Sequence, residues 1–158
     1  MKQRMAYLIL FLILFIFYGS PWENKKQQKL SNDIEQTIQC LQSHLGKPHA
    51  SKSKHGLDCS ALVKTCYKSV EIELPRDSRS QFEIGRKVKE REAQKGDLIF
   101  FTGSNAASPR VGHSGIITGI NNDDIQFIHA TLNKGVIESS LSEAYYRKRY
   151  KGIKRIIE

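Results

Sequence analysis

Cysteine is scarce in this 158-residue sequence, which contains only Cys40, Cys59 and Cys66. An odd number cannot pair completely within one chain, so an exported protein of this kind would keep at least one thiol free or paired with another molecule. No internal repeat is visible, and the length leaves room for one compact domain of ordinary size. A second domain is therefore not expected.

Long apolar runs are also missing. The longest covers residues 6–18, which is shorter than the roughly 20 apolar residues that a membrane-spanning helix needs. Lys2 and Arg4 precede it, as in a secretory signal, but Tyr18 is large for a position near a cleavage site, so an uncleaved anchor remains an alternative. No cysteine lies near the run, which argues against a lipoprotein. We expect residues 1–20 to be a signal peptide or signal anchor.

Acidic residues are fewer than basic ones, and the formal net charge is +9. Such a balance favours an acidic partner, such as nucleic acid, an anionic membrane or an anionic wall polymer. Export removes most of the case for nucleic acid, and the basic residues cluster only in the tail from Arg147 to Arg155, which we interpret as a solvated surface. We expect no nucleic-acid partner, membrane contact only through the N-terminal segment, and a monomer.

The remaining chain divides into a polar, lysine-rich linker over residues 21–30 and a domain over residues 31–158. Apolar residues recur at helical spacing after Ser31, and Asn32 with Glu35 can form a capping box. The recurring residues are Ile34, Ile38, Leu41 and Leu45. The pattern predicts a helix that begins near Ser31.

A second amphipathic helix is predicted to follow Asp58, with Cys59 in its first turn, and Ser78 lies in a polar segment that can cap a short helix. Beyond Gly96 the pattern becomes extended. The strand candidates cover residues 98–101, 113–118, 125–129, 135–138 and 152–157. Helices first and antiparallel strands afterwards indicate an α+β domain.

Cys59 stands out among the cysteines because of its place at the helix start. A thiol in the first turn lies near the positive end of the helix dipole and near unpaired backbone N–H groups, which lower its pKa and can receive a developing oxyanion. Cys40 and Cys66 lie among apolar residues and are interpreted as small core residues. A cysteine at a helix start is more often structural than catalytic, so a partner base is required.

His113 and His129 can supply that base and a group to orient it. They lie on strand candidates before and after a turn at Asn121–Asp124, so a hairpin would bring them onto neighbouring strands. They share a face, about 7–8 Å apart at Cα, only if the hairpin has an odd-numbered loop or a bulge; a two-residue loop would place them on opposite faces. The catalytic interpretation therefore predicts one of those two irregularities.

Two further expectations concern the same region. Gly112 and Gly115 flank His113 and are expected to leave space for the end of a helix to approach the strand. A zinc site that uses Cys59, His113 and His129 is chemically possible, but the sequence offers no close-spaced ligand pairs among them. A nucleophile, a base and an orienting group explain the three residues better.

The chain from Ser31 to Ile157 resembles the NlpC/p-sixty family of papain-like peptidases, which cut bacterial cell-wall peptides. The matching segments, in the order typical of the family, are Leu45-Gly46-Lys47-Pro48, Gly56-Leu57-Asp58-Cys59-Ser60-Ala61-Leu62-Val63, Leu74-Pro75-Arg76-Asp77-Ser78, Lys95-Gly96-Asp97-Leu98-Ile99-Phe100-Phe101, Gly112-His113-Ser114-Gly115-Ile116 and Phe127-Ile128-His129-Ala130. Each block alone is weak evidence, but the ordered set is highly specific. The resemblance implies a papain-like fold, in which the cysteine helix packs on a central antiparallel sheet.

The resemblance also implies roles for individual residues. Cys59 is expected to be the nucleophile, His113 the general base and later acid, and His129 the residue that orients His113. Asp58, Ser60 and Ser78 match residues that help to hold the substrate peptide in relatives, although N-capping of helices explains them equally well. His49 replaces a tyrosine that commonly borders the active site, and it could contact substrate instead. No cofactor and no metal are expected.

The function implied is that of a peptidoglycan hydrolase, exported to the bacterial periplasm or cell envelope, or anchored there by its N-terminus. It would be a cysteine endopeptidase that cleaves a stem-peptide amide bond near the D-glutamyl-diamino acid linkage of a peptidoglycan or muropeptide substrate. Two alternatives stay open. A related amidase or acyltransferase would use the same residues on another acyl substrate, and a non-catalytic wall-binding module would need only a groove and the basic surface.

Overall fold

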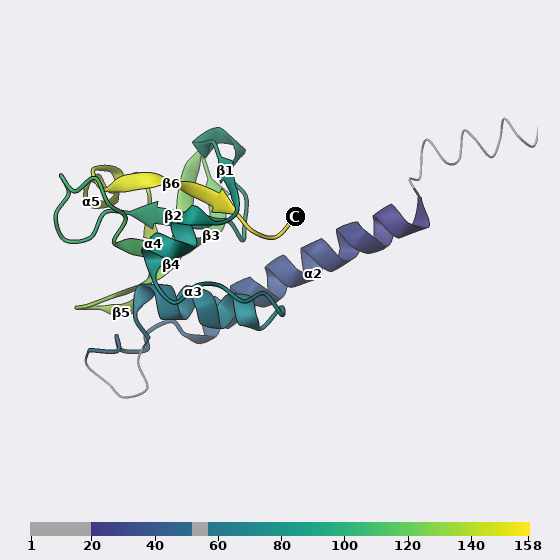
Figure 1. Ribbon diagram of the computed structural model, residues 1–158, viewed down its shortest axis with the longest axis horizontal. Coiled ribbons are helices and arrows are strands. Elements are labelled where there is room, and N and C mark those ends of the chain that lie inside the picture. Colours follow the sequence, from purple (N-terminus) through teal and green to yellow (C-terminus); the bar gives the residue numbers. More distant parts are fainter. Residues whose placement is uncertain (1–19, 52–56) are drawn as a thin grey trace, which may run out of the picture. The chain divides into compact units, whose positions relative to one another are not determined.

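The computed structural model describes residues 20–51 and 57–158 (Figure 1). The chain divides into two compact units, Met1–Asn32 and Asp33–Glu158. The signal peptide or anchor expected over residues 1–20 lies outside the described residues, apart from Ser20. Within the described ranges, no helix combines the length and the apolar character needed to cross a membrane.

Helix α2 covers Pro21–Ser43, so residues 21–30 are helical and the expected start near Ser31 is wrong. Ser20 and Glu23 supply the capping box: the Ser20 N–H donates to Glu23 Oε2 at 2.9 Å and the Glu23 N–H donates to Ser20 Oγ at 3.3 Å. Pro21 fits the first helical position, where a backbone N–H is not needed. Because α2 continues through Asn32, this residue lies inside the helix and cannot act as its N-cap.

The helix that carries Cys59 is α3, Cys59–Lys68. Asp58 caps it, because its Oδ1 accepts the Ala61 N–H at 2.8 Å. The other short helices are α4 (Ser78–Glu83), the 3₁₀ turn η1 (Glu90–Glu92) and α5 (Ala144–Arg147). Asp77, not Ser78, caps α4 by accepting the Ser80 N–H at 3.0 Å.

One antiparallel six-stranded sheet forms the centre of the second unit, in the order β1-β6-β2-β3-β4-β5. Its strands are β1 (Arg86–Val88), β2 (Leu98–Phe101), β3 (His113–Asn121), β4 (Asp124–Thr131), β5 (Gly135–Ser140) and β6 (Tyr150–Arg155). Helix α3 packs against β3 and β4 (Figure 1). The expected α+β, papain-like fold with the cysteine helix on the sheet is confirmed; the short edge strand β1, the 3₁₀ turn η1 and helix α5 were not anticipated.

Both faces of the sheet are covered near β2, where every residue is buried. Phe101 packs on one face with Phe127 and Tyr146, at ring-centroid distances of 5.0 and 5.5 Å. On the other face Phe100 meets Phe82 of α4, at 5.1 Å between ring centroids. Alternation along a strand sends neighbouring side chains to opposite faces, so a continuous apolar run is what a strand buried on both faces requires.

A buried charge pair and a tyrosine fasten the beginning of β2. Asp97, 2% exposed, accepts hydrogen bonds from Arg155 Nε at 2.7 Å and Arg155 Nη2 at 2.8 Å, which join β6 to this point. The Tyr67 hydroxyl of α3 donates to the carbonyl of the adjacent Gly96. The cysteine helix is therefore attached to the sheet by a directed bond as well as by apolar packing.

Cys40 and Cys66 form a disulfide between α2 and α3, so the expectation that both are merely small core residues is wrong. Their Cα atoms lie 5.4 Å apart, a normal separation for a disulfide. Cys59 is the free cysteine. The odd cysteine count is thus explained by one bridge and one thiol.

We expect the Cys40–Cys66 bridge to stabilise the fold by about 3 kcal/mol, because it closes a loop of intermediate length in the unfolded chain. Urea unfolding of the wild type with and without reductant should show this difference in the free energy of unfolding. The double variant Cys40→Ala/Cys66→Ala should show no response to reductant. Titration of denatured, unreduced protein should find one thiol per chain; three thiols would refute the bridge.

Candidate active site

The start of α3 places Cys59 at the wall of a cavity of about 640 Å³. His49, His113 and His129 line the same cavity. Cys59 is half-buried, whereas His129 is 1% exposed. A free thiol and three imidazoles therefore share one enclosed space, although they come from distant parts of the sequence.

The β3–β4 hairpin determines how His113 and His129 face each other. Its turn has two residues, Asn122 and Asp123, both with positive φ, and Asn121 pairs with Asp124. Such a turn alone would place the two histidines on opposite faces. The register shifts between Ile117 and Gly119, however, and beyond this bulge Ile116 pairs with Ile128. The extra residue restores a common face, as the sequence argument required.

The two imidazoles are directly hydrogen-bonded: His113 Nε2 lies 2.7 Å from His129 Nδ1. His129 Nε2 lies 3.1 Å from Ser139 Oγ, and the Ser139 hydroxyl donates to the Tyr146 Oη at 3.3 Å. Because Ser139 uses its proton on Tyr146, it accepts from His129 Nε2–H. His129 Nδ1 then accepts from His113 Nε2–H, which leaves His113 Nδ1 unprotonated.

Gly112 and Gly115 were expected to leave space for the end of a helix, but they are in close contact with other groups. A Cβ on Gly112 would lie 2.7 Å from the Gly103 nitrogen, so it makes room for the β2–β3 segment. A Cβ on Gly115 would lie 2.9 Å from the Ile128 oxygen and 3.1 Å from the His129 Cβ. These glycines admit neighbouring backbone and the second histidine, not a helix end.

Burial sets the protonation states in the cavity. Desolvation raises the pKa of Cys59, hydrogen bonds with the Ser114 backbone, the Ser60 backbone and the Ser114 side chain oppose this rise, and the Asp58 charge adds to it. The expectation that the helix start lowers this pKa on balance is therefore wrong. Burial, with a contribution from the charge of His49, lowers the pKa of His113 to about 4. Burial also lowers the pKa of His129. Thiol and both imidazoles are neutral at rest near neutral pH.

Gln81 is a buried polar residue that sequence reasoning missed. Its Nε2 donates to the Ser60 carbonyl and to the Pro75 carbonyl, each at 3.0 Å, and its Oε1 accepts from Ser114 Oγ at 3.2 Å. Ser114 in turn bonds to Cys59. Gln81 thus connects the cysteine helix to β3. A glutamine inside a polar segment carries no signal in the sequence that distinguishes it from a solvated one.

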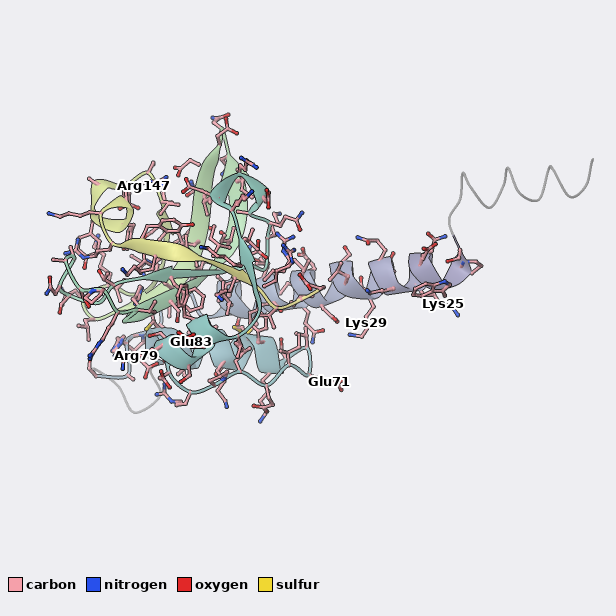
Figure 2. The ribbon with its side chains drawn as sticks, turned by 45° about the horizontal axis from the view of Figure 1, so that its top comes forward. Lys25, Lys29, Glu71, Arg79, Glu83 and Arg147 are labelled. Carbon is pink, nitrogen blue, oxygen red and sulfur yellow. A yellow bond between two sulfur atoms is a disulfide. The ribbon has the colours of Figure 1, made fainter. Side chains whose placement is uncertain are left out.

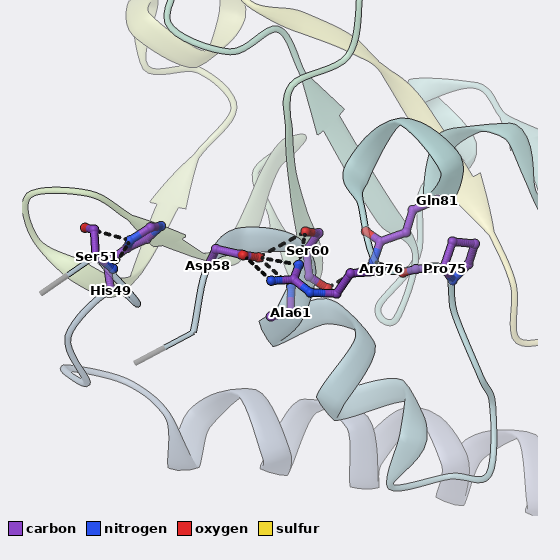
Figure 3. A network of polar contacts seen from close by, with 8 residues as sticks. All are labelled: His49, Ser51, Asp58, Ser60, Ala61, Pro75, Arg76 and Gln81. Atoms are coloured by element: carbon purple, nitrogen blue, oxygen red, sulfur yellow. Dashed lines mark hydrogen bonds and ion pairs between the residues drawn. The ribbon is translucent and has the colours of Figure 1, made fainter. Parts of the chain in front are cut away.

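Asp58 and Ser60 belong to a separate network beside the helix start (Figure 3). Arg76 Nη2 donates to Asp58 Oδ2 at 2.5 Å, and Arg76 Nη1 donates to Ser60 Oγ and to Asp58 Oδ1, each at 3.1 Å. Burial opposes ionisation of Asp58, yet the hydrogen bonds from Arg76, the Ala61 N–H and Ser60 lower its pKa to about 2. Arg76, which had been given no role, is the centre of this network.

The expected substrate-binding residues therefore separate into two groups. His49 lines the cavity, where its Nδ1 accepts the Ser51 N–H at 3.1 Å (Figure 3). Asp58, Ser60 and Ser78 do not line it. Asp58 is an N-cap, as the structural explanation held, and also an ion-pair partner of Arg76.

One ring nitrogen of His113 and one of His129 are taken up by the hydrogen bond between them. Among the described residues, three potential ligands also gather at Cys40, His44 and Cys66. The two sulfurs of that cluster are joined in the disulfide, so they are not available as thiolate ligands.

Comparison with known proteins places this arrangement in context. The sequence matches the NlpC/P60 family over residues 46–155. It is 41% identical over 106 residues to the probable endopeptidase NlpC homolog of Haemophilus influenzae, a match that covers 66% of this chain and 52% of that protein. It is 36% identical over 106 residues to the murein DD-endopeptidase MepS/murein LD-carboxypeptidase of Escherichia coli, with the same coverage of 66% and 52%. The chain spans about half the length of these relatives.

Among solved structures, the fold resembles that of an NlpC/P60 family protein from Bacillus cereus, with a TM-score of 0.70 and 31% identity. The superposition covers 79% of this chain and 40% of that one. The structural similarity therefore extends over most of this chain.

We expect alkylation of Cys59 by iodoacetamide to be slow at neutral pH and to rise about tenfold per pH unit through pH 7–9, because burial raises the pKa of the thiol and only the thiolate reacts. Mass spectrometry of the labelled peptide measures the rate. Cys59→Ala is the control, since the disulfide removes the other sulfurs from reaction. A rate that is already constant from pH 6 upward would instead indicate a thiolate–imidazolium pair.

Proposed function

Because this chain belongs to the NlpC/P60 family, we propose that it is a cysteine endopeptidase that hydrolyses stem-peptide amide bonds of bacterial peptidoglycan. The observation that carries the proposal is the His113–His129 hydrogen bond in the cavity that holds the free thiol of Cys59. The similarity to a murein endopeptidase supports the choice of substrate. The bond to be cut lies at or near the D-glutamyl-diamino acid linkage.

In the first step the Cys59 sulfur attacks the carbonyl carbon of the scissile amide, and its proton moves to His113 Nδ1. The unprotonated Nδ1 and the hydrogen-bonded Nε2 of His113 support this direction of transfer. Because the thiol and the imidazole are both neutral in the free protein, the attack requires transfer of the thiol proton to His113. The oxyanion is received by backbone N–H groups at the start of α3, including that of Cys59.

His113 then donates its proton to the leaving amine, and the carbon–nitrogen bond breaks to leave an acyl-enzyme. A water molecule gives a proton to His113 as it attacks the thioester, and the peptide acid is released with return of the proton to sulfur. Throughout, His129 accepts from His113 Nε2, which holds the ring in the tautomer that the mechanism needs. His129 is thus a positioning residue.

The substrate of this proposal lies outside the cytoplasm. Residues 1–20 would export the chain, and they would either be removed or retained as an anchor in the cell envelope. The alternatives differ in their use of the thiol. A wall-binding module would not need Cys59, whereas an amidase or acyltransferase would need it but would leave the stem peptide intact.

We expect the full chain to cleave purified muropeptides and Cys59→Ala to be inactive, since no other described residue of the cavity offers a comparable nucleophile. Mass spectrometry of the products identifies the bond. Ser43→Ala, which removes an exposed hydroxyl outside the cavity and leaves all three sulfurs in place, is the control and should stay active. If the wild type and Cys59→Ala bind wall fragments equally and neither cleaves them, the protein is a wall-binding module and not a peptidase.

We expect His129→Leu to lower kcat/KM by a factor of roughly 10²–10⁴, because His113 loses the acceptor that fixes its tautomer. His129→Gln, which keeps an amide acceptor, should recover part of the loss, and His44→Gln outside the cavity should be neutral. Since His113 must be neutral to accept the thiol proton, wild-type kcat/KM should fall as the pH drops through about 4, the pKa of His113. Full activity of His129→Leu with an unchanged pH profile would remove His129 from the mechanism.

A further inference from the structure

The cavity that contains Cys59 continues to helix α5, where Arg149 lines its wall. Arg149 follows the helix directly, at the end of the segment that leads into β6. Neither Asp58 nor Ser60 lines the cavity. The Arg149 end is therefore distinct from the Arg76 network beside the start of α3.

The guanidinium of Arg149 is held in place by uncharged groups. Its Nη1 donates to the Tyr145 carbonyl at 3.1 Å and its Nη2 donates to the Ser104 carbonyl at 3.4 Å. Its central carbon lies 3.7 Å from the centroid of the Tyr145 ring, a close cation–π contact. These contacts fix the position of the cation but leave its charge without a matching anion.

Arg149 differs from the nearby Arg147 in having no ion-pair partner among the described residues. Arg147, the last residue of α5, donates from both terminal nitrogens to Glu90, each at 2.9 Å. Arg149 has no carboxylate within ion-pair distance in the part of the chain that the structure describes. Glu143 is the acidic residue of the cavity wall, and its Oε1 accepts the Ser140 N–H at 2.9 Å.

Unused hydrogen-bonding capacity lies at the same end. Thr102 also lines the cavity and is 3% exposed, and its backbone N–H donates to the Arg149 carbonyl at 2.8 Å. Thr102 Oγ1 and Arg149 Nε are the buried side-chain atoms that find no partner among the described residues. Buried polar atoms without partners are rare because each one costs free energy. Both occur where an unpaired cation meets the cavity.

We propose that Arg149 and Thr102 form a subsite for a carboxylate of the substrate, carried by the diamino acid whose amine leaves. This proposal rests on the proposed peptidase function, because the subsite shares the cavity of Cys59. A guanidinium is the side chain best suited to a carboxylate, and enclosure strengthens the interaction. For cleavage after D-glutamate, the diamino acid carries the longest side chain next to the bond, and a cavity of about 640 Å³ has room for it.

Such a subsite would distinguish substrates by the side chain of their diamino acid. Diaminopimelate and lysine differ by one carboxylate at the end of the side chain. An enzyme that uses Arg149 in this way prefers stem peptides with diaminopimelate over those with lysine or with amidated diaminopimelate. A purely structural Arg149, which only ties Ser104 to Tyr145, has no such preference.

The test measures kcat/KM of the full chain on three muropeptides that differ only in the diamino acid: diaminopimelate, its side-chain amide, and lysine. We expect wild type to prefer the free carboxylate by about tenfold or more, the contribution of a charge-assisted hydrogen bond. Arg149→Gln should lose this preference, mainly through slower cleavage of the diaminopimelate substrate. Arg149→Lys, which keeps the charge, should retain part of it.

Arg147→Gln is the matched control, because Arg147 (Figure 2) lies two residues before Arg149, at the end of α5, but does not line the cavity. It should leave the preference unchanged. A fourth muropeptide, with D-glutamate amidated and diaminopimelate intact, tests whether Arg149 binds the carboxylate of D-glutamate instead. If Arg149→Gln removes discrimination only at D-glutamate, the assignment to the diamino acid is wrong.

A second measurement uses the wild type alone and does not depend on the folding of variants. Free diaminopimelate should inhibit cleavage at concentrations about tenfold lower than lysine does. Equal cleavage of the three substrates by wild type, with equal inhibition by the two amino acids, would overturn the subsite and leave the peptidase intact. Equal slowing of all substrates by Arg149→Gln would make Arg149 structural. Failure of wild type to cleave any of them would refute the proposed function itself.

Discussion

The cavity depends on a single irregularity in the β3–β4 hairpin. A two-residue turn at Asn122 and Asp123 would, by strict alternation, send His113 and His129 to opposite faces. The bulge at Thr118 inserts one residue and returns them to one face, where their rings meet at 2.7 Å. Because side chains alternate with a period of two, no smaller adjustment of the backbone could have the same effect. The hydrogen bond between the two imidazoles thus depends on the strand register that the bulge sets.

The second requirement is that the cysteine helix keeps Cys59 at the wall of the cavity that the two histidines line. Three attachments of different kinds hold α3: the disulfide from Cys66 to α2, the Tyr67 bond to the Gly96 carbonyl, and Gln81, which joins the Ser60 carbonyl to Ser114 of β3. They act at different points along the helix, so together they limit its rotation as well as its translation. A cavity wall built by one movable helix needs such directed contacts, because apolar packing alone tolerates small shifts.

The sequence was sufficient for the α+β class and for the need of either an odd-numbered loop or a bulge, since both follow from residue periodicity. It failed where the outcome depends on long-range contacts. The helix start moved to Pro21 because Ser20 and Glu23 cap it better than Asn32 and Glu35. Cys40 and Cys66 have no pattern in the chain that distinguishes a bridge from two core residues. Gln81 and Arg149 gain their positions only through the assembled sheet, and the pKa of Cys59 depends on burial that no local motif reveals.

The raised pKa of Cys59 is compatible with the proposed export of the chain. Oxidants and disulfide exchange act on the thiolate, so a buried thiol with a neutral imidazole nearby is protected while no substrate is present. The other two sulfurs are joined to each other in the folded chain, so neither is free to form a disulfide with Cys59. A resting ion pair would react faster with substrate, but it would also keep a nucleophile exposed to every electrophile outside the cytoplasm. Burial therefore keeps the Cys59 thiol protonated and slow to react with oxidants, and the thiol loses its proton only when it attacks the substrate.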